Sequence, residues 1–216
     1  MSEYNQLKEL VLPQRIERLK RVLQNRVVSV TLVLENLHKD YNISAILRTC
    51  ESFGIHEVHV VPQPGEGKVF GTVTQGCHKW LSIRRHDSVS GCLEELRNRD
   101  FKIMAGAFGA EAVPLESAEF SGRVALVFSN ELNGASGEVL DMVDGFFNIP
   151  MCGFSRSLNV SVAAGIVIHH VLRYKREKRE PLERLSTEEA DRLFEGWVKK
   201  SVRRAEDVLM ELRSRK

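Results

Sequence analysis

The sequence predicts an α/β protein: an open parallel sheet with helices on both faces, and a helical extension at each end. Two observations carry this prediction. Short runs rich in β-branched residues alternate with segments of helical periodicity, and the first run, VVSVTLVLE at 27–35, is apolar almost throughout, as expected of a strand covered on both faces. Alternating strands and helices require parallel strand pairs, because each crossover returns the chain to the same end of the sheet.

The predicted elements follow one another in a regular order. After the first strand comes a helix ending at Phe53, with Asn42 or Ser44 as its cap and Gly54 as its left-handed stop. The segment EVHVV at 57–61 is the second strand. The later elements are a helix over 89–99, strands over 101–107 and 123–129, a helix over 136–143, a short strand through Ile149 and a core helix over 157–178.

The two ends of the chain are predicted to be helical and basic. Residues 1–26 form an N-terminal extension with a break or kink at Pro13, residues 27–178 form the main domain, and residues 179–216 form a C-terminal extension. The first 26 residues carry six Lys or Arg against three acidic residues, and residues 173–216 carry fourteen against ten, so the middle of the chain is net negative. Basic ends favour a polyanionic partner, and the alternative is that they are simply solvated helix faces.

Composition indicates an ordinary globular protein. Of the 216 residues, 43% are hydrophobic and 28% charged, which argues against disorder. Charges interrupt the apolar positions of the first twenty residues, and no later stretch is apolar enough to span a membrane. We therefore expect a cytoplasmic protein that does not bind a membrane.

Common cofactor and metal signatures are incomplete. Gly65 and Gly67 begin a GxGxxG pattern, but Phe70 replaces the third glycine. This weakens the evidence for a nicotinamide oxidoreductase. The Gly67-Lys68 pair has Pro62 where a phosphate-binding loop needs its first glycine. We therefore expect neither a dinucleotide fold nor a nucleotide hydrolase.

No metal site is predicted. His56 and His59 lie three apart on a predicted strand and so point to opposite faces, where they cannot share an ion. The cysteines form no CxxC pair, and we expect them to be reduced and mostly buried: they are Cys50, Cys77, Cys92 and Cys152.

Polar residues gather where the predicted strands end. Ligands of open parallel sheets bind at the carboxyl ends of the strands, here the loops after Glu35, Ala107, Ser129 and Ile149. Helix capping is the alternative explanation for several of these residues, and for Asn42 we favour it. The residues in question are Asn36, His38, Asn42, Arg48, Asn130, Glu131, Ser155, Ser157 and Asn159.

Arg48 is not explained by capping. It falls inside the first helix beside Ile46, Leu47 and Cys50, where a permanent charge needs a partner or an anion. Glu131, at the end of another strand, is a natural partner, or the two side chains meet across a ligand.

Four segments in this order resemble TrmH-type methyltransferases of the SPOUT superfamily. LENLHKDYNISAILRTCESFGIHEVHVV at 34–61 resembles the first family motif, and GCHKW at 76–80 a segment between motifs. VFSNELNGAS at 127–136 resembles the second motif, with Ser129 where many members carry glycine. IPMCGFSRSLNVSVAA at 149–164 resembles the third, and its SLNVS core is the most specific match.

The resemblance implies a Rossmann-like parallel sheet with a C-terminal trefoil knot, a homodimer, and S-adenosyl-L-methionine as cofactor. It implies 2′-O-methylation of a ribose in RNA, with guanosine-18 of the tRNA D-loop as the target because both terminal extensions are typical of that group. A ribosomal RNA methyltransferase and a non-catalytic RNA-binding module of the same superfamily are the alternatives.

The resemblance also assigns the site. The catalytic set is Arg48, Asn42, Glu131, Ser157 and Asn159. The cofactor-binding set is Ala105, Ala107, Ser129, Asn130, Gly134, Ile149, Met151, Ser157 and Leu158. A guanidinium keeps its proton to high pH, so Arg48 is expected to clamp a phosphate and stabilise developing alkoxide charge and not to act as a simple base.

Overall fold

The computed structural model describes residues 3–62, 76–107, 111–130, 134–155 and 157–214. These residues fall into two compact units. One unit comprises the central part of the chain, from Val27 to Glu183, and the other joins the two ends, Met1–Arg26 and Arg184–Lys216.

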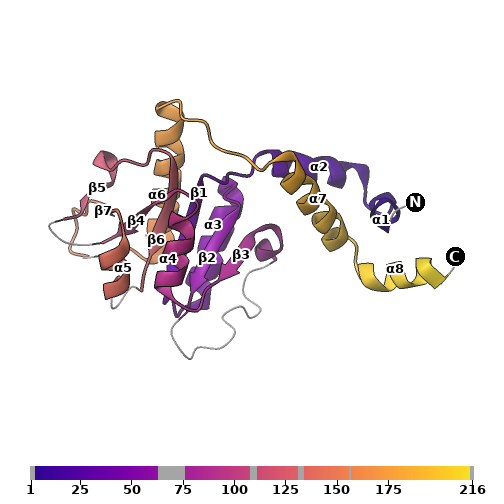
Figure 1. Cartoon of the computed structure of the whole chain (residues 1–216), viewed down its shortest axis with the longest axis horizontal. Helices are drawn as coiled ribbons and strands as arrows, with labels where there is room; N and C mark the ends of the chain where they lie inside the picture. Colours follow the sequence, from indigo (N-terminus) through magenta and orange to yellow (C-terminus); the bar gives the residue numbers. More distant parts are fainter. Residues whose placement is uncertain (1–2, 63–75, 108–110, 131–133, 156, 215–216) are drawn as a thin grey trace. The chain divides into compact units, whose positions relative to one another are not determined.

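The central unit is built on a seven-stranded sheet in the order β3-β2-β1-β6-β4-β7-β5 (Figure 1). Every pairing between neighbouring strands is parallel, as the alternation of elements predicts. The strands are β1 (Val30–Glu35), β2 (Glu57–Val61), β3 (Ser82–Arg85), β4 (Phe101–Gly106), β5 (Val113–Pro114), β6 (Arg123–Phe128) and β7 (Gly145–Asn148).

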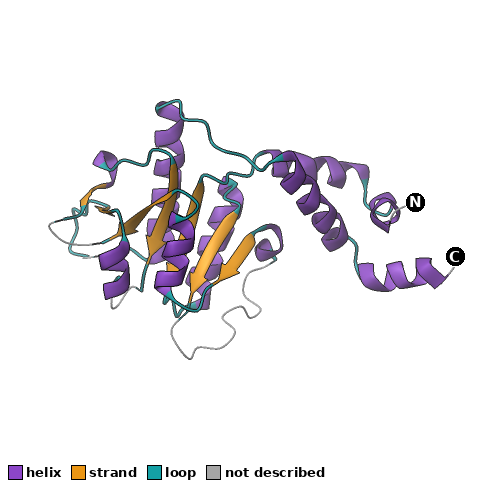
Figure 2. Cartoon of the chain, viewed as in Figure 1, coloured by secondary structure: helices purple, strands orange, loops and turns teal. Residues whose placement is uncertain are grey.

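Helices cover both faces of this sheet (Figure 2). On one face, α3 (Asp40–Phe53) and α6 (Val160–Glu177) pack in one core cluster with alternate residues of the central strands. On the other face, α4 (Val89–Arg97) and α5 (Gly137–Met142) pack against the intervening strand residues. All six residues of β1 are buried, which explains why its sequence is a continuous apolar run instead of an alternating one.

Two 3-10 turns complete the described elements of this unit. The 3-10 turns η2 (Cys77–Trp80) and η3 (Leu115–Ser117) precede β3 and follow β5. Neither β3, with its polar sequence SIRR, nor the two-residue β5 was predicted, because both lie at sheet edges where little apolar pattern is needed. Gly54 ends α3 with φ of 80°, in the left-handed region that only glycine adopts readily, as predicted.

The predicted cap of α3 was wrong. The helix begins at Asp40, so Asn42 and Ser44 lie inside its first turns, and its N-cap Lys39 makes no side-chain capping bond. The core helix α6 begins at Val160, three residues later than predicted, and its basic end carries Lys175 and Arg176.

The terminal unit consists of helices alone. It contains α1 (Glu3–Glu9), α2 (Pro13–Gln24), α7 (Thr187–Ser201) and α8 (Ala205–Ser214). Pro13 is the first residue of α2, which agrees with the predicted break in the N-terminal helix. Trp197 of α7 is buried beneath the Arg26 guanidinium, 5.3 Å from its ring centroid. Among the described helices, none combines the length and apolar character needed to cross a membrane.

A buried ion pair fastens the end of α6 to the start of β6. Lys175 is 1% exposed; its ammonium donates to the Gly122 carbonyl and to the Glu180 carboxylate, the latter at 3.1 Å. Burial by itself raises the pKa of Glu180, but hydrogen bonds from Lys175, Ser121 and the Gly122 amide outweigh it and lower the pKa below 4.5.

We predict that Glu180→Gln lowers the free energy of unfolding by about 1.5–3 kcal/mol near neutral pH, because Lys175 loses its charged acceptor. The native carboxylate has a lowered pKa, so its contribution is present above 4.5 and is lost as the pH falls below that value. Urea unfolding across this range should therefore show a shallower acid-dependent loss of stability in the variant. Glu177→Gln, in a surface pair with Arg173, is the control and should leave the pH profile unchanged.

Candidate active site at the carboxyl edge of the sheet

The four loops that the sequence predicts to bind a ligand lie at one edge of the sheet. They follow β1, β6, β4 and β7, which are four consecutive neighbours in the strand order. Because these strands are parallel, their carboxyl ends meet at the same edge.

Asn130 fastens two of these loops together. Its side-chain amide donates to the Asn36 carbonyl at 3.0 Å, which joins the end of β6 to the end of β1. Its own carbonyl accepts from the Gly134 amide at 2.9 Å, and Gly134 adopts φ of 69°. The second-motif loop is therefore closed at its base. Glu131, the predicted partner of Arg48, lies outside the described residues.

Glu35 lies at the same edge and was not among the residues selected from the sequence. It ends β1 with 1% exposure, and its carboxylate accepts the Ser136 amide at 3.3 Å and 3.4 Å through its two oxygens. Ser136 is the N-cap of α5, so Glu35 anchors the far end of the loop that starts at Ser129. The available signal was an acidic residue ending a fully apolar strand, since a buried carboxylate requires a donor.

Asn42 and Asn159 meet across the two helices of one face. The Asn159 amide donates to the Asn42 side-chain oxygen at 3.0 Å, although 117 residues separate them. Asn159 is also the N-cap of α6, where its oxygen accepts from the Ser161 amide at 2.8 Å and the Ser161 hydroxyl at 2.6 Å. Capping is thus confirmed for Asn159, whereas Asn42 is a buried link between α3 and α6.

The expectation that Arg48 lies in apolar surroundings was wrong. Ile43, Ile46, Leu47 and Cys50 form the buried stripe of α3, and Arg48 falls on its exposed side. The error arose because three of its sequence neighbours are buried, while the helical period turns Arg48 away from them. Arg48 is therefore positioned to meet a ligand that approaches from solvent.

The described residues of the third-motif loop, 149–155 and 157–159, have no regular secondary structure. Met151, Ser155 and Ser157 are exposed and Ile149 and Leu158 are half-buried, so the loop presents apolar and hydroxyl groups together. Ser157 lies two residues before the N-cap of α6 and does not cap that helix.

The predicted cofactor-binding residues Ala105 and Ala107 are held by the sheet. Ala105 is fully buried inside β4, and the Ala107 amide donates to the Phe147 carbonyl at 3.0 Å.

The side chains at this edge fit S-adenosylmethionine. The Ser129 hydroxyl is buried at the end of β6 and has no hydrogen-bond partner among the described residues. A buried polar group without a partner is costly, and a ligand with amino, carboxylate and hydroxyl groups can satisfy it. Half-buried Ile149 and Leu158 supply apolar contact for a purine ring.

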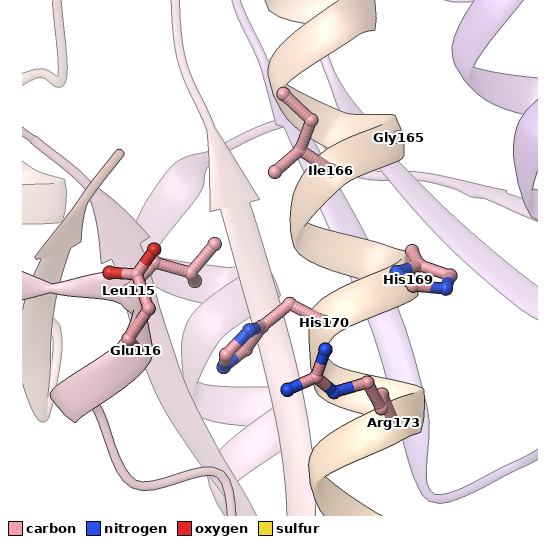
Figure 3. Close-up of a pocket in the computed structure, with 7 residues that line it drawn as sticks. All are labelled: Leu115, Glu116, Gly165, Ile166, His169, His170 and Arg173. Atoms are coloured by element: carbon pink, nitrogen blue, oxygen red, sulfur yellow. The ribbon is translucent and has the colours of Figure 1, made fainter. Parts of the chain in front are cut away.

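A separate pocket lies along the middle of α6 and is not this site. His170 and Arg173 project from the helix beside Leu115 and Glu116 of η3, and His169 lies on another side of the helix (Figure 3). The cavity measures about 370 Å³. Burial lowers the pKa of His170 below its ordinary value. None of the predicted site residues lines this pocket.

Comparison with known proteins places the chain in a family. Residues 29–169 match the SpoU rRNA Methylase family. The chain belongs to this SpoU family. It is 35% identical to a tRNA (guanosine(18)-2'-O)-methyltransferase of Aquifex aeolicus, with 94% of each chain covered. It is 34% identical to the enzyme of the same name from Thermus thermophilus, covering 86% of this chain and 96% of the relative.

A solved SpoU structure has the same fold. The A. aeolicus TrmH/SpoU tRNA modifying enzyme superposes with a TM-score of 0.79 at 33% identity, covering 88% of this chain and 98% of that one. The predicted family and parallel-sheet fold are therefore confirmed. The trefoil knot stays a prediction from the family.

We predict that Asn42 and Asn159 are energetically coupled. Asn159→Ala should cost about 1 kcal/mol through the lost helix cap alone, and the bond to Asn42 should add a coupling free energy of about 0.5–1.5 kcal/mol. A double-mutant cycle of Asn42→Ala and Asn159→Ala, followed by urea unfolding, measures this term. Ser186→Ala, which removes the cap of α7 in the other unit, is the control: combined with Asn42→Ala, its effect on the free energy of unfolding should be additive. Additivity of the two asparagine changes would contradict the proposed link.

Proposed function

We propose that this chain methylates the 2′-hydroxyl of guanosine-18 in tRNA, with S-adenosylmethionine as methyl donor. The observation that carries the proposal is membership of the SpoU family together with relatives of that activity that match nearly the whole chain. In this proposal residues 27–178 form the methyltransferase domain, while residues 1–26 and 179–216 contact RNA. The reaction takes place in the cytoplasm.

S-adenosylmethionine would lie among the loops that follow β4, β6 and β7 at the carboxyl edge. The Ser129 hydroxyl and backbone groups of Asn130, Gly134 and Met151 would hold its polar parts, and Ile149 and Leu158 would contact its adenine. Ala105 and Ala107 would line one side of it. When bound, S-adenosylmethionine supplies an activated methyl group on a sulfonium.

Arg48 positions the ribose and stabilises charge on its oxygen. Its exposed guanidinium donates to the neighbouring phosphate, and its positive charge favours the alkoxide that develops as the 2′-hydroxyl loses its proton. Phosphate or water accepts that proton, since a guanidinium cannot act as a base near neutral pH. Glu131 orients Arg48 or the ribose.

The asparagine pair and Ser157 organise the rest of the site. Asn42 and Asn159 hold the start of α6 against α3, which fixes the third-motif loop just before it. Ser157, exposed two residues before the N-cap, contacts the nucleotide. Positioning of this kind supplies much of the rate of a transfer between two bound partners.

The active form is a homodimer. α6 leaves Val162 and Ile166 exposed at 51% and 41%, and Phe53 of α3, 38% exposed, makes an edge contact with His169 of α6 at 6.1 Å. Val162 lies three residues after Asn159, so a second copy seated on this apolar strip of α3 and α6 borders the start of α6. Sedimentation equilibrium of the full chain tests this assembly.

The terminal unit provides the RNA contact. Lys199 and Lys200 end α7 on its exposed side, next to Arg203 and Arg204. Such residues gain affinity by releasing counterions from phosphates, so a chain without residues 183–216 should bind tRNA more weakly, with a flatter salt dependence.

Ribosomal RNA is the second candidate substrate, because the matching family is described by rRNA methylation. We expect label from methyl-labelled S-adenosylmethionine to enter an unmodified tRNA transcript with guanosine at position 18, and little label when that base is replaced. Equal labelling of both transcripts would show that the enzyme methylates another nucleotide of the tRNA. Labelling of ribosomal RNA alone would favour the second candidate, and cofactor binding without labelling of any RNA would favour a non-catalytic module.

We predict that Arg48→Ala lowers the methylation rate at least ~100-fold, because it removes the charge that favours the alkoxide. Affinity for S-adenosylmethionine and the urea midpoint should stay near those of the wild type, since the side chain is exposed. Single-turnover methylation and calorimetric titration measure the two effects. Arg173→Ala, an exposed arginine of α6, is the matched control and should keep the rate. Unfolding of Arg48→Ala would show that the residue is structural.

A further inference from the structure

Three potential metal ligands meet on the face of the sheet opposite to α3 and α6. They are His59 of β2, His86 directly after β3, and Cys92 of α4. One ring nitrogen of each histidine and the Cys92 sulfur lie within 4.8 Å of one another. His59 and Cys92 are fully buried, and His86 keeps 12% of its side chain exposed.

Hydrogen bonds orient His59 toward the centre of this cluster. Its Nε2 lies 2.9 Å from the Glu57 carboxylate, which can only accept, so the ring hydrogen is on Nε2. Glu57 is itself held by Arg99 at 2.6 Å. The lone pair of His59 Nδ1 therefore faces His86 Nε2, 2.8 Å away.

The two imidazoles meet end to end. Their centroids are 5.0 Å apart and their planes differ by 24°, and this separation corresponds to the 2.8 Å contact between nitrogens extended by the two rings. These two nitrogens thus point toward each other, and the Cys92 sulfur lies within 4.8 Å of one ring nitrogen of each histidine. On the far side of His86, the Glu95 carboxylate lies 4.0 Å from Nδ1.

We propose that His59 Nδ1, His86 Nε2 and Cys92 Sγ bind a divalent transition metal of the zinc class. Two imidazoles and one thiolate are donors that this class prefers. Carboxylates behind metal-binding histidines are the usual outer partners, and Glu57 and Glu95 occupy those places. The ion joins β2, β3 and α4 and takes no part in methyl transfer.

Binding requires a small rearrangement. Two nitrogens on one tetrahedral zinc are roughly 3.4 Å apart, so His86 must move away from His59 by about half an ångström. His86 is the partly exposed member and can both move and admit the ion from solvent. Its ring proton passes to Nδ1, toward Glu95, and the thiol proton leaves to solvent. Burial raises the pKa of Cys92 to about 12, so the metal must displace this proton.

The site was missed in the sequence because its ligands come from three elements. His56 and His59 were compared only with each other, whereas the partners of His59 lie 27 and 33 residues further on, directly after a polar edge strand and on the next helix. Nothing in their spacing resembles a zinc motif.

Cobalt titration of the full chain, stripped of metal and kept reduced, tests the proposal. We expect one equivalent of Co²⁺ per chain to produce a thiolate-to-cobalt charge-transfer band that excess Zn²⁺ abolishes. Cys92→Ser should lose the band, and His86→Gln should weaken binding at least ~10-fold. Cys152→Ser, an exposed thiol outside the cluster, is the matched control and should keep the band.

Thermal unfolding distinguishes a variant that has lost the metal site from one that does not fold. The melting midpoint of the wild type and of Cys152→Ser should rise with Zn²⁺ concentration, because the ion binds the folded state. Absence of a charge-transfer band in the wild type, or a band that persists in Cys92→Ser, would overturn the proposal and leave His59 and His86 as a hydrogen-bonded pair.

Discussion

Parallel pairing of four neighbouring strands is the constraint on which the rest of this structure depends. β1, β6, β4 and β7 are consecutive in the sheet, and their direction places the loops that follow them at one edge. Strands of this kind are covered on both faces, so their residues are buried and the register cannot slip without exposing apolar side chains. The sheet thereby fixes the points at which the loops of the predicted site begin.

Polar contacts fix the positions of the segments at this edge. Asn130 ties β6 to β1, Glu35 anchors the start of α5, and Asn159 ties α6 to α3. Each contact joins segments about a hundred residues apart in sequence and satisfies groups that would otherwise be buried without partners. Arg48, by contrast, lies on the exposed side of α3.

Much of the fold could be predicted from sequence because its signals are local. Continuous apolar runs mark β1 and β6, and Gly54 marks the end of α3. The order of strands could not be predicted, because β1 pairs with β6 across almost a hundred residues. Nothing in the sequence of either strand indicates which strand it pairs with. The polar edge strand β3 was missed for the opposite reason, since it has no apolar pattern.

The site was predictable only in part, and chiefly through family resemblance. The resemblance selected Asn42 and Asn159, but only the structure shows that they bond to each other. The orientation of Arg48 was misjudged because sequence neighbours on a helix point in different directions. Glu35 and the cluster of His59, His86 and Cys92 depend on contacts between elements, which spacing along the chain does not reveal.

We propose that the carboxyl edge of the sheet holds S-adenosylmethionine. Hydrogen–deuterium exchange of the full chain with and without this compound tests it most directly. We expect slower exchange in the loops around 105–107, 129–136 and 149–159, with little change along the pocket of α6 from Gly165 to Arg173. Protection of that pocket, with the three loops unaffected, would contradict it.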